Sequence, residues 1–372
     1  MTTGLHLMLL TGDTVPEPAP AALMDALHQV RVTSASGVTN GFQLTLALSP
    51  KSPLRQAVMP GGALGVKKRI VVAVVLGGRC QVLMDGLITR QEVHAGQAPG
   101  SSFLTVTGED LSLLMDLEHV RRAYPGLPPH LRAVTVCARY AQYGITPLAV
   151  PPVRTDQPDP AVAIPVQVAT DLAYLRATAA DVGHLFHLEP GPAPGLSTAY
   201  WGPQKREGGP QPALTTDCGA ADNVEELSFA FDGLSATRYG THHVEPGSRT
   251  VSEVVPPEPQ VLRRSLAAGP APALCTRPLT GQTGRSLTRT QLAGLGRAVS
   301  GDPVTAQGTL DVLRYGQVLS AHHLVGVRGA GPAYDGTYLV RGVTHDLTRS
   351  TYRQHFTLAR DGLVSDTQVV SP

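Results

Sequence analysis

Apolar and polar residues alternate along the first third of the chain, which is the pattern of half-buried β-strands. Residues 41–48 place four large apolar side chains on one strand face: Phe42, Leu44, Leu46 and Leu48. Three further segments have strand character: 69–76, 79–94 and 102–108. Gly77 and Gly78 separate the first two of these at the position of a hairpin turn. Short strands with Gly and Pro between them predict a small antiparallel barrel or sandwich.

The apolar period then changes to that of a helix, and the middle of the chain reads as α+β. The apolar faces predicted for three helices are Leu111, Leu114 and Met115, then Leu131, Val134, Ala138 and Ala141, and then Leu172, Leu175 and Val182. Pro128 begins the second helix and Gly144 ends it. Thr170 or Asp171 caps the third helix, and Gly183 ends it. Two segments that follow, 184–189 and 197–203, return to strand character.

Strand patterns dominate again in the last third of the chain. Residues 227–231 alternate in the manner of a strand, and 288–299 are expected to form a helix. Residues 338–360 read as a β-hairpin with its turn at 348–350. Within the hairpin, Gly342 shifts the apolar phase as a β-bulge would.

An internal repeat gives the expected domain organisation. Residues 84–111 and 340–363 share a cadence in which Gly86 and Phe103 match Gly342 and Phe356. The predicted fold is mainly β with α+β inserts, built on two similar antiparallel β-barrels. The expected units are a first tube-like barrel (1–108), an α+β insert domain (109–210), a second tube-like barrel (211–244 and 303–366), a Pro/Gly-rich loop and helix insert (245–302) and a tail (367–372). Residues 245–285 of the later insert are expected to be irregular.

Charge and cysteine content narrow the classes of function. Lys and Arg number 30 and Asp and Glu 29, so no basic excess points to nucleic acid. The four cysteines, Cys80, Cys137, Cys218 and Cys275, form no C-x-x-C pair and predict free, mostly buried thiols. The N-terminus has no basic segment of a signal peptide, and the apolar run 70–76 is too short to span a bilayer. A cytoplasmic chain without membrane insertion is expected.

The polar cluster in the hairpin at 338–360 is the first candidate for catalysis. His345, Asp346 and Ser350 lie within six positions, and His355 follows them. Neighbouring residues of a strand point to opposite faces, so His345 and Asp346 cannot form a histidine–carboxylate pair there. No G-x-S-x-G elbow is present in the sequence. We therefore expect the exposed polar face of a hairpin and no catalytic residue.

Histidine clusters are the candidates for a metal site. In 184–189, His184 and His187 lie on opposite faces of a strand, and only His187 and Glu189 share one. The adjacent pairs in 241–245 and 321–324 have the same geometry. Ordinary strand histidines are expected, and no metal site is predicted.

The glycine-rich and acidic segments carry no enzyme signature. Residues 329–336 contain G-x-G between two strands and predict a hairpin loop, whereas 60–68 lack the Gly-Lys-Ser/Thr ending of a phosphate-binding loop. An acidic cluster comprises Asp217, Asp222, Glu225 and Glu226. It is interpreted as a solvated face.

Residues 171–203 resemble the phage late control gene D family, which includes baseplate hub proteins and the amino-terminal part of VgrG spikes. In that family a helix D-x-x-(F/Y)-L-x-x-x-A-x-x-x-G leads into a strand and a (Y/F)-x-G-P turn. The matching residues are Tyr174, Leu175, Ala179, Gly183, Tyr200, Gly202 and Pro203. This helix departs from the pattern in having Thr178 and Ala180 around its alanine. Residues 211–233 and 308–363 resemble the return strand and the carboxy-terminal end of the same family.

The resemblance implies a structural hub that assembles as a homotrimer. Six barrels from three chains would form a ring joining a six-fold inner tube to a three-fold spike. The implied setting is the baseplate of a contractile phage tail or injection system, with no enzymatic activity and no cofactor. Implied partners are further copies of the chain, inner-tube and tube-initiator proteins, baseplate wedge components and a spike. The sequence ends soon after Leu363, so the spike is expected to be a separate polypeptide.

Two alternatives belong to other classes of function. One is a hydrolase that uses His345 with a distant acid and Ser350. The other is a β-module that binds carbohydrate or cell wall. Aromatic residues make up 5% of the chain and Trp201 is its single tryptophan, which argues against a stacking platform for sugars.

Overall fold

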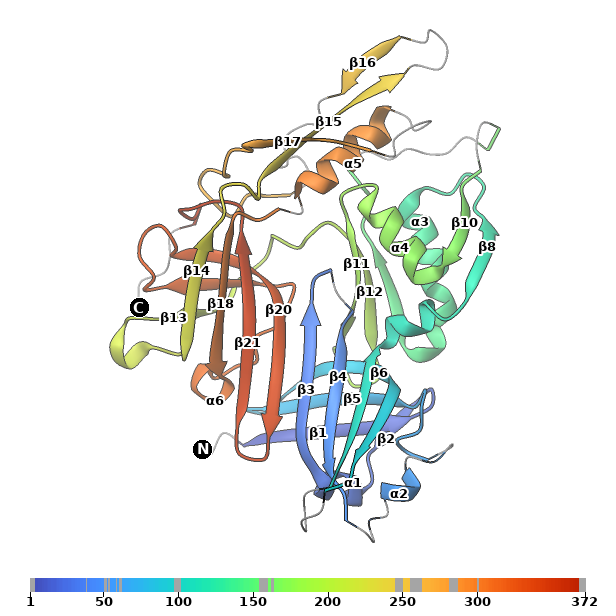
Figure 1. Cartoon of the computed structure of the whole chain (residues 1–372), viewed down its shortest axis with the longest axis vertical. Coiled ribbons are helices and arrows are strands. Elements are labelled where there is room, and N and C mark those ends of the chain that lie inside the picture. Colours follow the sequence, from blue (N-terminus) through green and yellow to red (C-terminus); the bar gives the residue numbers. More distant parts are fainter. Residues whose placement is uncertain are drawn as a thin grey trace.

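The computed structural model shows a molecule built mainly from antiparallel β-sheet, with the helices α3 (Pro129–Cys137) and α4 (Asp171–Ala180) together at one side of it (Figure 1). The residues it describes are 4–37, 39–49, 52, 54–57, 59, 62–96, 102–153, 160–161, 164–244, 250–254, 263–280, 287–299 and 301–367. Within these ranges, the helices are all too short or too polar to cross a membrane.

Six strands form the first half of the main sheet, in the order β1-β5-β6-β7-β4-β3. Their bounds are Leu5–Gly12 (β1), Leu27–Ala35 (β3), Gly41–Ala47 (β4), Arg69–Leu76 (β5), Arg79–His94 (β6) and Phe103–Asp110 (β7). The strands predicted at 41–48, 69–76, 79–94 and 102–108 are confirmed. Gly77 and Gly78 form the β5–β6 turn with φ of 58° and 80°. The short elements β2 (Pro16–Pro18), α1 (Ala21–Ala26) and α2 (Leu54–Ala57) lie between these strands in the chain.

The second half repeats this strand order, as β13-β19-β20-β21-β18-β14. The bounds are Gln211–Thr215 (β13), Glu226–Phe231 (β14), Val304–Asp311 (β18), Leu324–Arg328 (β19), Gly336–Thr348 (β20) and Tyr352–Arg360 (β21). If the six strands of each half are numbered in chain order, their order across the sheet is first, fourth, fifth, sixth, third and second in both halves. Pairing directions also agree, except that β1 is antiparallel to β5 and β13 is parallel to β19. The short helix α6 (Val312–Tyr315) follows β18.

The two halves join edge to edge because β20 pairs with β3. In Figure 1, the strands β14, β18, β21, β20, β3 and β4 stand side by side across this seam. Val32 of β3 and Val343 of β20 belong to one apolar core that extends into both halves. The described strands therefore form one continuous 13-stranded sheet. The expected pair of closed barrels is not found in the described residues, since the sheet order runs through the seam without closing.

A β-bulge occupies the same place in both halves. On β6 the pairing with β7 shifts between Ile88 and Arg90. On β20 the pairing with β21 shifts between Val340 and Gly342, which confirms the bulge predicted at Gly342. The topological counterpart of Gly342 is therefore Arg90.

The residue matches expected for the internal repeat are wrong, although the strands correspond. Gly86 lies before the bulge of β6 and not at it. Phe103 pairs with His94 at the far end of β6, whereas Phe356 pairs with Val343, next to the bulge of β20. The bulges change the phase of the sequence pattern, so matching glycines to glycines aligned the strands out of register.

An α+β insert follows β7. Its elements are η1 (Leu111–Met115), β8 (His119–Ala123), α3 (Pro129–Cys137), η2 (Ala138–Tyr143), β9 (Ile145–Ala149), β10 (Val166–Thr170), α4 (Asp171–Ala180), β11 (Leu185–Pro190) and β12 (Ser197–Gly202). They enclose a second apolar core centred on the buried Trp201. The third predicted helix, α4, is confirmed: Ala173 N donates to Thr170 Oγ1 at 3.2 Å, and Gly183 follows with φ 72°.

The two earlier helices of this insert differ from their predictions. Residues 111–115 form a single short 3₁₀ helix, after which the chain continues as a strand. In α3 the buried residues are Pro129, Arg132, Ala133, Val136 and Cys137, and the predicted face is wrong because Leu131 is exposed. The 3₁₀ helix η2 begins directly after α3, so α-helical spacing does not continue to Gly144.

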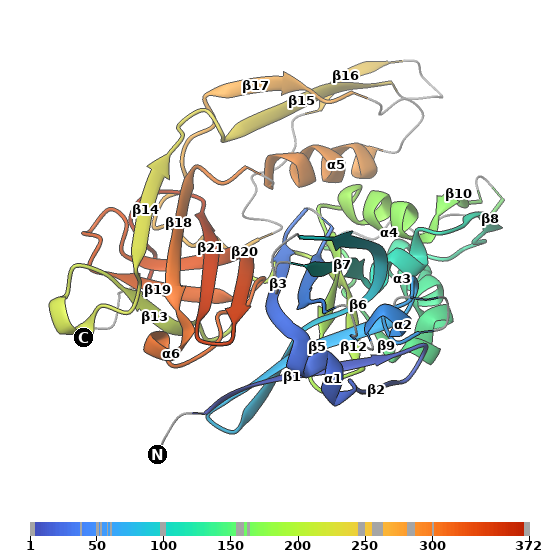
Figure 2. The ribbon, with the colours of Figure 1, turned by 60° about the horizontal axis from the view of Figure 1, so that its bottom comes forward.

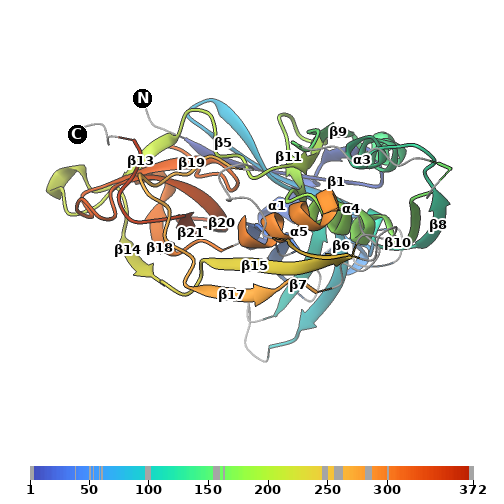
Figure 3. The same cartoon turned by 90° about the horizontal axis from the view of Figure 1, so that it is seen from above.

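A second insert separates β14 from β18. It contains β15 (Thr237–Val244), β16 (Val251–Val254), β17 (Cys275–Pro278) and the predicted helix, α5 (Leu287–Val299). The expectation of an irregular stretch at 245–285 is wrong where β16 and β17 pair with β15; residues 245–249, 255–262 and 281–285 lie outside the described part. Figures 2 and 3 show α5 between β15 and α4. A Cβ at Gly296 of α5 would lie 2.7 Å from the Cα of Gly183, so the two helices meet closely there.

Candidate functional surface

The hairpin of β20 and β21 has one face in the core and one face toward solvent. Val343 and Leu347 point into the core, and His345 lies between them with 4% of its surface exposed. The prediction that His345 belongs to an exposed face is therefore wrong. Its Nδ1 lies 2.8 Å from Tyr352 Oη and 3.2 Å from Gln354 Nε2. Burial lowers the pKa of His345 to about 3, so the ring is neutral inside the sheet.

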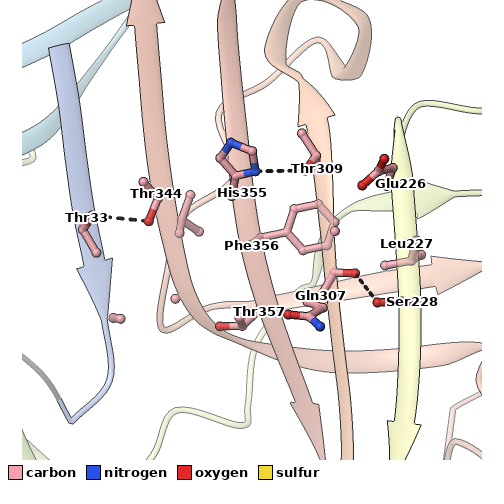
Figure 4. Close-up of a pocket in the computed structure, with 14 residues that line it drawn as sticks. Thr33, Glu226, Leu227, Ser228, Gln307, Thr309, Thr344, His355, Phe356 and Thr357 are labelled. Carbon is pink, nitrogen blue, oxygen red and sulfur yellow. Dashed lines mark hydrogen bonds between the residues drawn. The ribbon is translucent and has the colours of Figure 1, made fainter.

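A row of polar side chains crosses five strands on the solvent side. Thr344 lies opposite Thr33 on one side and His355 on the other, and Thr309 lies between His355 and Glu226. The hydroxyls of Thr33 and Thr344 are 3.3 Å apart, and Thr309 Oγ1 lies 2.9 Å from His355 Nδ1 (Figure 4). The row runs through the β20–β3 seam without a break.

The neighbouring row carries charges of both signs. Arg31 Nη2 donates to Asp346 Oδ2 at 2.9 Å, and Gln29 Nε2 donates to Asp346 Oδ1 at 2.6 Å. Burial alone would raise the pKa of Asp346, but these donors lower it below its usual value. One strand further, Arg353 pairs with Glu225 at 3.2 Å. Positive and negative groups alternate here, so this surface has no field of one sign that would attract nucleic acid.

We call the solvent side of strands β14, β18, β21, β20, β3, β4 and β7 the polar face. Its residues are Glu226, Ser228, Ala230, Thr305, Gln307, Thr309, Arg353, His355, Thr357, Gly342, Thr344, Asp346, Gln29, Arg31, Thr33, Ala35, Gln43, Thr45, Ala47, Phe103, Thr105, Thr107 and Glu109. Threonine is the commonest residue, and Phe103 at the start of β7 is the large apolar side chain among them. Over β14 to β3 the face is hollowed into an open groove of about 710 Å³ (Figure 4). Short hydroxyl side chains bind water well and present little apolar surface to a passing molecule.

The three hairpin residues considered for hydrolysis are not brought together. Ser350 lies in the turn, where its N–H donates to Thr348 Oγ1 at 3.3 Å. His345 points into the core and Asp346 to the polar face, as strand alternation predicts. The hydrogen-bond partners of His345 are the buried Tyr352 and Gln354, so neither Ser350 nor Asp346 is placed against this imidazole.

A different cluster forms where three parts of the chain meet. The rings of His187 and His322 stack with their centroids 4.0 Å apart. His187 Nε2 lies 2.9 Å from Glu189 Oε1, which confirms their predicted common face, and Lys205 Nζ donates to the same carboxylate at 2.6 and 2.7 Å. His322 Nδ1 lies 3.1 Å from Ser36 Oγ, which follows β3. Burial, reinforced by His187, lowers the pKa of His322 to about 3, so this junction holds a neutral imidazole.

The remaining histidines do not form a metal site in the described part of the chain. His184 packs edge-on against Trp201 with ring centroids 4.8 Å apart, and burial lowers its pKa to about 4. His242 is exposed on β15, while the side chain of His243 and residue 245 lie outside the description. Among the residues described, no three His, Cys, Asp or Glu side chains converge as ligands.

The glycine-rich loop at 329–336 joins β19 to β20, which confirms the predicted hairpin loop. Its geometry is fixed by a hydrogen bond from Ala330 N to Asp335 Oδ1 at 2.8 Å. In the stretch 60–68, residues 60 and 61 lie outside the described part, and Lys68 pairs with Asp13 at 2.7 Å. Lys68 is therefore engaged by a carboxylate.

The acidic cluster and the cysteines have separate environments. Asp222 Oδ1 accepts from Cys218 N at 2.7 Å, and Glu225 pairs with Arg353 on another strand, so these carboxylates do not converge. The four cysteines are free, as expected. Only Cys137 is buried, however, and Cys80 and Cys218 are exposed, which makes the prediction of mostly buried thiols wrong. Cys80 lies on β6 opposite Val75, close to the β5–β6 turn.

A buried ion pair that sequence reasoning missed holds the α+β insert to the first half. Arg69 Nε donates to Asp85 Oδ1 at 2.7 Å, and Nη2 donates to Oδ2 at 2.6 Å. The same Nη2 reaches the carbonyls of Tyr143 and Gly195 in the insert, at 2.8 and 2.9 Å. Burial raises the pKa of Asp85, and Arg69 opposes that shift. In the sequence, the sign of this ion pair is Asp85, a carboxylate within the otherwise apolar part of β6.

A second buried network joins both inserts to the second half. Arg206 pairs with Asp302 at 2.8 Å and with Asp361 at 3.2 Å. Arg263 approaches Asp302 at 3.2 Å, and Arg341 pairs with the other oxygen of that carboxylate. Burial would raise the pKa of Asp302, but the surrounding guanidinium groups lower it. Charged residues far apart in the chain thus fix the second half, the α+β insert and the later insert together.

The chain matches known proteins in its structure and not in its sequence. No family model matches the sequence, and no curated protein matches it. A tail protein from Neisseria meningitidis MC58 superposes with a TM-score of 0.64 at 17% identity, over 97% of this chain and 98% of that one. The 43 kDa tail protein of prophage MuSo2 from Shewanella oneidensis gives 0.61 at 13% identity, over 95% and 98%. A chain of the Francisella PdpA-VgrG complex gives 0.59 at 6% identity, over 99% of this chain and 54% of that one. This chain therefore has the fold of phage tail proteins and of a VgrG-complex component.

Proposed function

We propose that this chain is a structural baseplate hub of a contractile phage tail or a contractile injection system. The observation that carries the proposal is the repeated strand order of the two halves, in a chain that has a tail-protein fold over 97% of its length. A chain with two similar halves can present six similar units in a homotrimer, which matches a six-fold tube on one side and a three-fold spike on the other.

In this proposal the tube-like units are residues 1–108 and residues 211–244 with 303–366. The inserts, 109–210 and 245–302, lie outside the ring. The partners are the inner tube and its initiator, the wedge components of the baseplate and a spike protein. The chain acts by assembly and carries no catalytic residue; its place is in a virion tail or an injection-system baseplate after synthesis in the cytoplasm.

The polar face suits the inner wall of the channel in such a ring. It runs over strands of both halves, it contains the ion pairs Arg31–Asp346 and Arg353–Glu225, and its commonest side chain is threonine. A hydrated wall without apolar patches lets a polymer pass without binding to it. The groove in Figure 4 is the part of this wall that spans the seam.

Tube nucleation tests the hub role directly. Purified inner-tube protein from the same tail is incubated with and without this chain, and polymer growth is followed by light scattering and electron microscopy. The proposal predicts a shorter lag and tubes that carry the chain at one end. Unchanged kinetics and bare tube ends would contradict it.

A further inference from the structure

The second half carries a hollow of about 530 Å³ on the side of β19 that faces away from the apolar core. Val325 and Val327 of β19 point into that core. Leu324, Gly326 and Arg328 alternate with them along the strand, so they line the hollow on the other side. The volume lies in the range of about 300–1,000 Å³ in which proteins bind small ligands.

The floor of the hollow is made of small side chains on three neighbouring strands. Gly326 lies opposite Thr337 of β20. On the other side of β19 is β13, where the Cβ of Ala213 would lie 3.3 Å from a Cβ added at Gly326. A larger side chain at Ala213 or Gly326 would occupy this space. The hollow therefore exists because the neighbouring strands carry small residues at the same level.

One wall of the hollow comes from the later insert and is apolar. Leu266 is 3% exposed and packs with Leu324 and Leu339 in a cluster separate from the two larger cores. Leu266 N donates to Asp361 Oδ1 at 2.9 Å, and Asp366 N donates to Leu266 O at 3.2 Å. Both backbone groups of the leucine are thus held by the second half, so the wall is formed without a ligand.

The lining carries more positive than negative charge. It contains three arginines and one aspartate, Arg206, Arg264, Arg328 and Asp366, which gives a formal charge of +2. Arg264 Nη2 pairs with Asp366 Oδ2 at 2.8 Å. Arg328 Nε donates to Thr215 Oγ1 at 2.8 Å, and among the described residues no carboxylate pairs with this guanidinium. An arginine held in this way through Nε keeps its Nη donors for a carboxylate.

Arg206 does not supply the excess charge to a ligand. Its side chain is buried, and its guanidinium pairs with Asp302 at 2.8 Å and with Asp361 at 3.2 Å in the network described above. Arg264 shares its charge with Asp366. Arg328 is therefore the arginine of the lining that has no carboxylate partner in the described part of the chain.

We propose that this hollow binds a short acidic segment of a partner protein, which places an aliphatic side chain over Gly326 and a carboxylate on Arg328. These two residues lie on one face of β19, two positions and about 7 Å apart. An extended peptide carries its side chains i and i+2 on one face at the same separation. The pattern that fits is an aliphatic and an acidic residue separated by one residue. The site is complete within one chain and is independent of the proposed homotrimer.

Fluorescence anisotropy with labelled peptides tests the site on the purified full chain. The probes are hexapeptides that are capped at both ends and centred on Leu-Ser-Glu or Glu-Ser-Leu, since the segment can run in either direction. In the better binder, replacing Glu by Gln or Leu by Ala should each raise the Kd at least tenfold. An equal Kd for the parent peptide and both substituted peptides would overturn the proposal.

Two variants of the chain assign the two contacts. Arg328→Gln should bind the Glu and Gln peptides equally, because the cation that distinguishes them is gone. Ala213→Leu fills the hollow and should bind the Leu and Ala peptides equally, and it tests the site even if Arg328→Gln does not fold. The matched control is Arg314→Gln, at an exposed position on α6 outside the hollow, which should keep both preferences. A tenfold preference for Glu retained by Arg328→Gln, or for Leu retained by Ala213→Leu, would contradict the assignment.

Two other occupants of the hollow would give different results in the same assay. The small molecule 4-methylpentanoate combines an aliphatic group and a carboxylate; if it displaced the labelled peptide at the Kd of that peptide, the hollow would be a site for small carboxylates and the proposal would be overturned. A peptide Kd that rises with the concentration of the chain would show that a second copy fills the hollow, with the same consequence. Displacement by the unlabelled parent peptide alone supports a partner segment.

Discussion

Phe356 of β21 lies directly opposite Gly308 of β18, and its ring occupies the space above the glycine. A Cβ at position 308 would lie 2.7 Å from Phe356 Cζ and would also meet the carbonyl oxygen of Glu226 on β14. Phe42 of β4 covers Gly108 of β7 in the same way. The two strand pairs correspond between the halves, and the phenylalanine and the glycine have exchanged strands.

Gly308→Ala should therefore destabilise the second half. The new methyl group would press on a backbone oxygen and a buried ring, and overpacking of this kind costs about 1–3 kcal/mol. Urea unfolding followed by circular dichroism measures the loss. Gly240→Ala is the matched control, because no atom lies within 4 Å of its added Cβ. Equal stability of the two variants would show that the sheet relaxes around the methyl group.

Arg69→Met should loosen the α+β insert from the first half. It leaves Asp85 as an uncompensated buried charge, which costs about 3–5 kcal/mol in the unfolding free energy. The control Arg31→Met breaks the Arg31–Asp346 pair, in which the arginine side chain is 52% exposed, and should cost about 0–1 kcal/mol. Combining Arg69→Met with Asp85→Leu should recover part of the loss. If Arg69→Met alone were as stable as the wild type, Arg69 would not anchor the α+β insert to the first half.

Acid should weaken the fold through its buried histidines. Burial lowers the pKa of His184 to about 4 and those of His322 and His345 to about 3. Unfolded histidine titrates near pH 6.5, so between about pH 6.5 and 4 the unfolded chain binds protons that the folded chain does not. Stability should therefore fall as the pH falls, by up to about 1.4 kcal/mol per pH unit for each histidine.

Urea unfolding at pH 7, 6 and 5 measures this dependence. His345→Gln should reduce the slope of unfolding free energy against pH by about one proton. His6→Gln, at an exposed position on β1, is the matched control for a histidine-to-glutamine change. A His345→Gln variant with the wild-type slope would show that this imidazole is protonated in the folded state.

Sequence patterning predicted individual strands well because alternation is local. The strand at 69–76 and the cap at Thr170 are set by residues within a few positions of each other. Sequence patterning gave wrong predictions where the structure depends on contacts between distant segments. The bulge after Ile88 changes which residues share a face, and the side of α3 that is buried depends on α4 packing against it.

The candidate surface shows the same limit. That His187 shares a face with Glu189 follows from strand periodicity, whereas its stacking on His322 requires two segments to meet in space. Strand alternation predicts on which side of β20 the side chain of Thr344 lies. It does not predict that Thr33 of β3 lies next to Thr344 across the seam. The polar face exists only once strands of both halves are aligned.

Native mass spectrometry of the purified chain tests the central claim most directly. A homotrimeric hub should give a dominant species at three times the chain mass of 39.1 kDa, with dimers only as minor intermediates. The trimer should persist at micromolar concentration and at moderate salt. A monomer at every concentration, or a dimer that does not grow, would contradict a three-fold hub built from two similar halves.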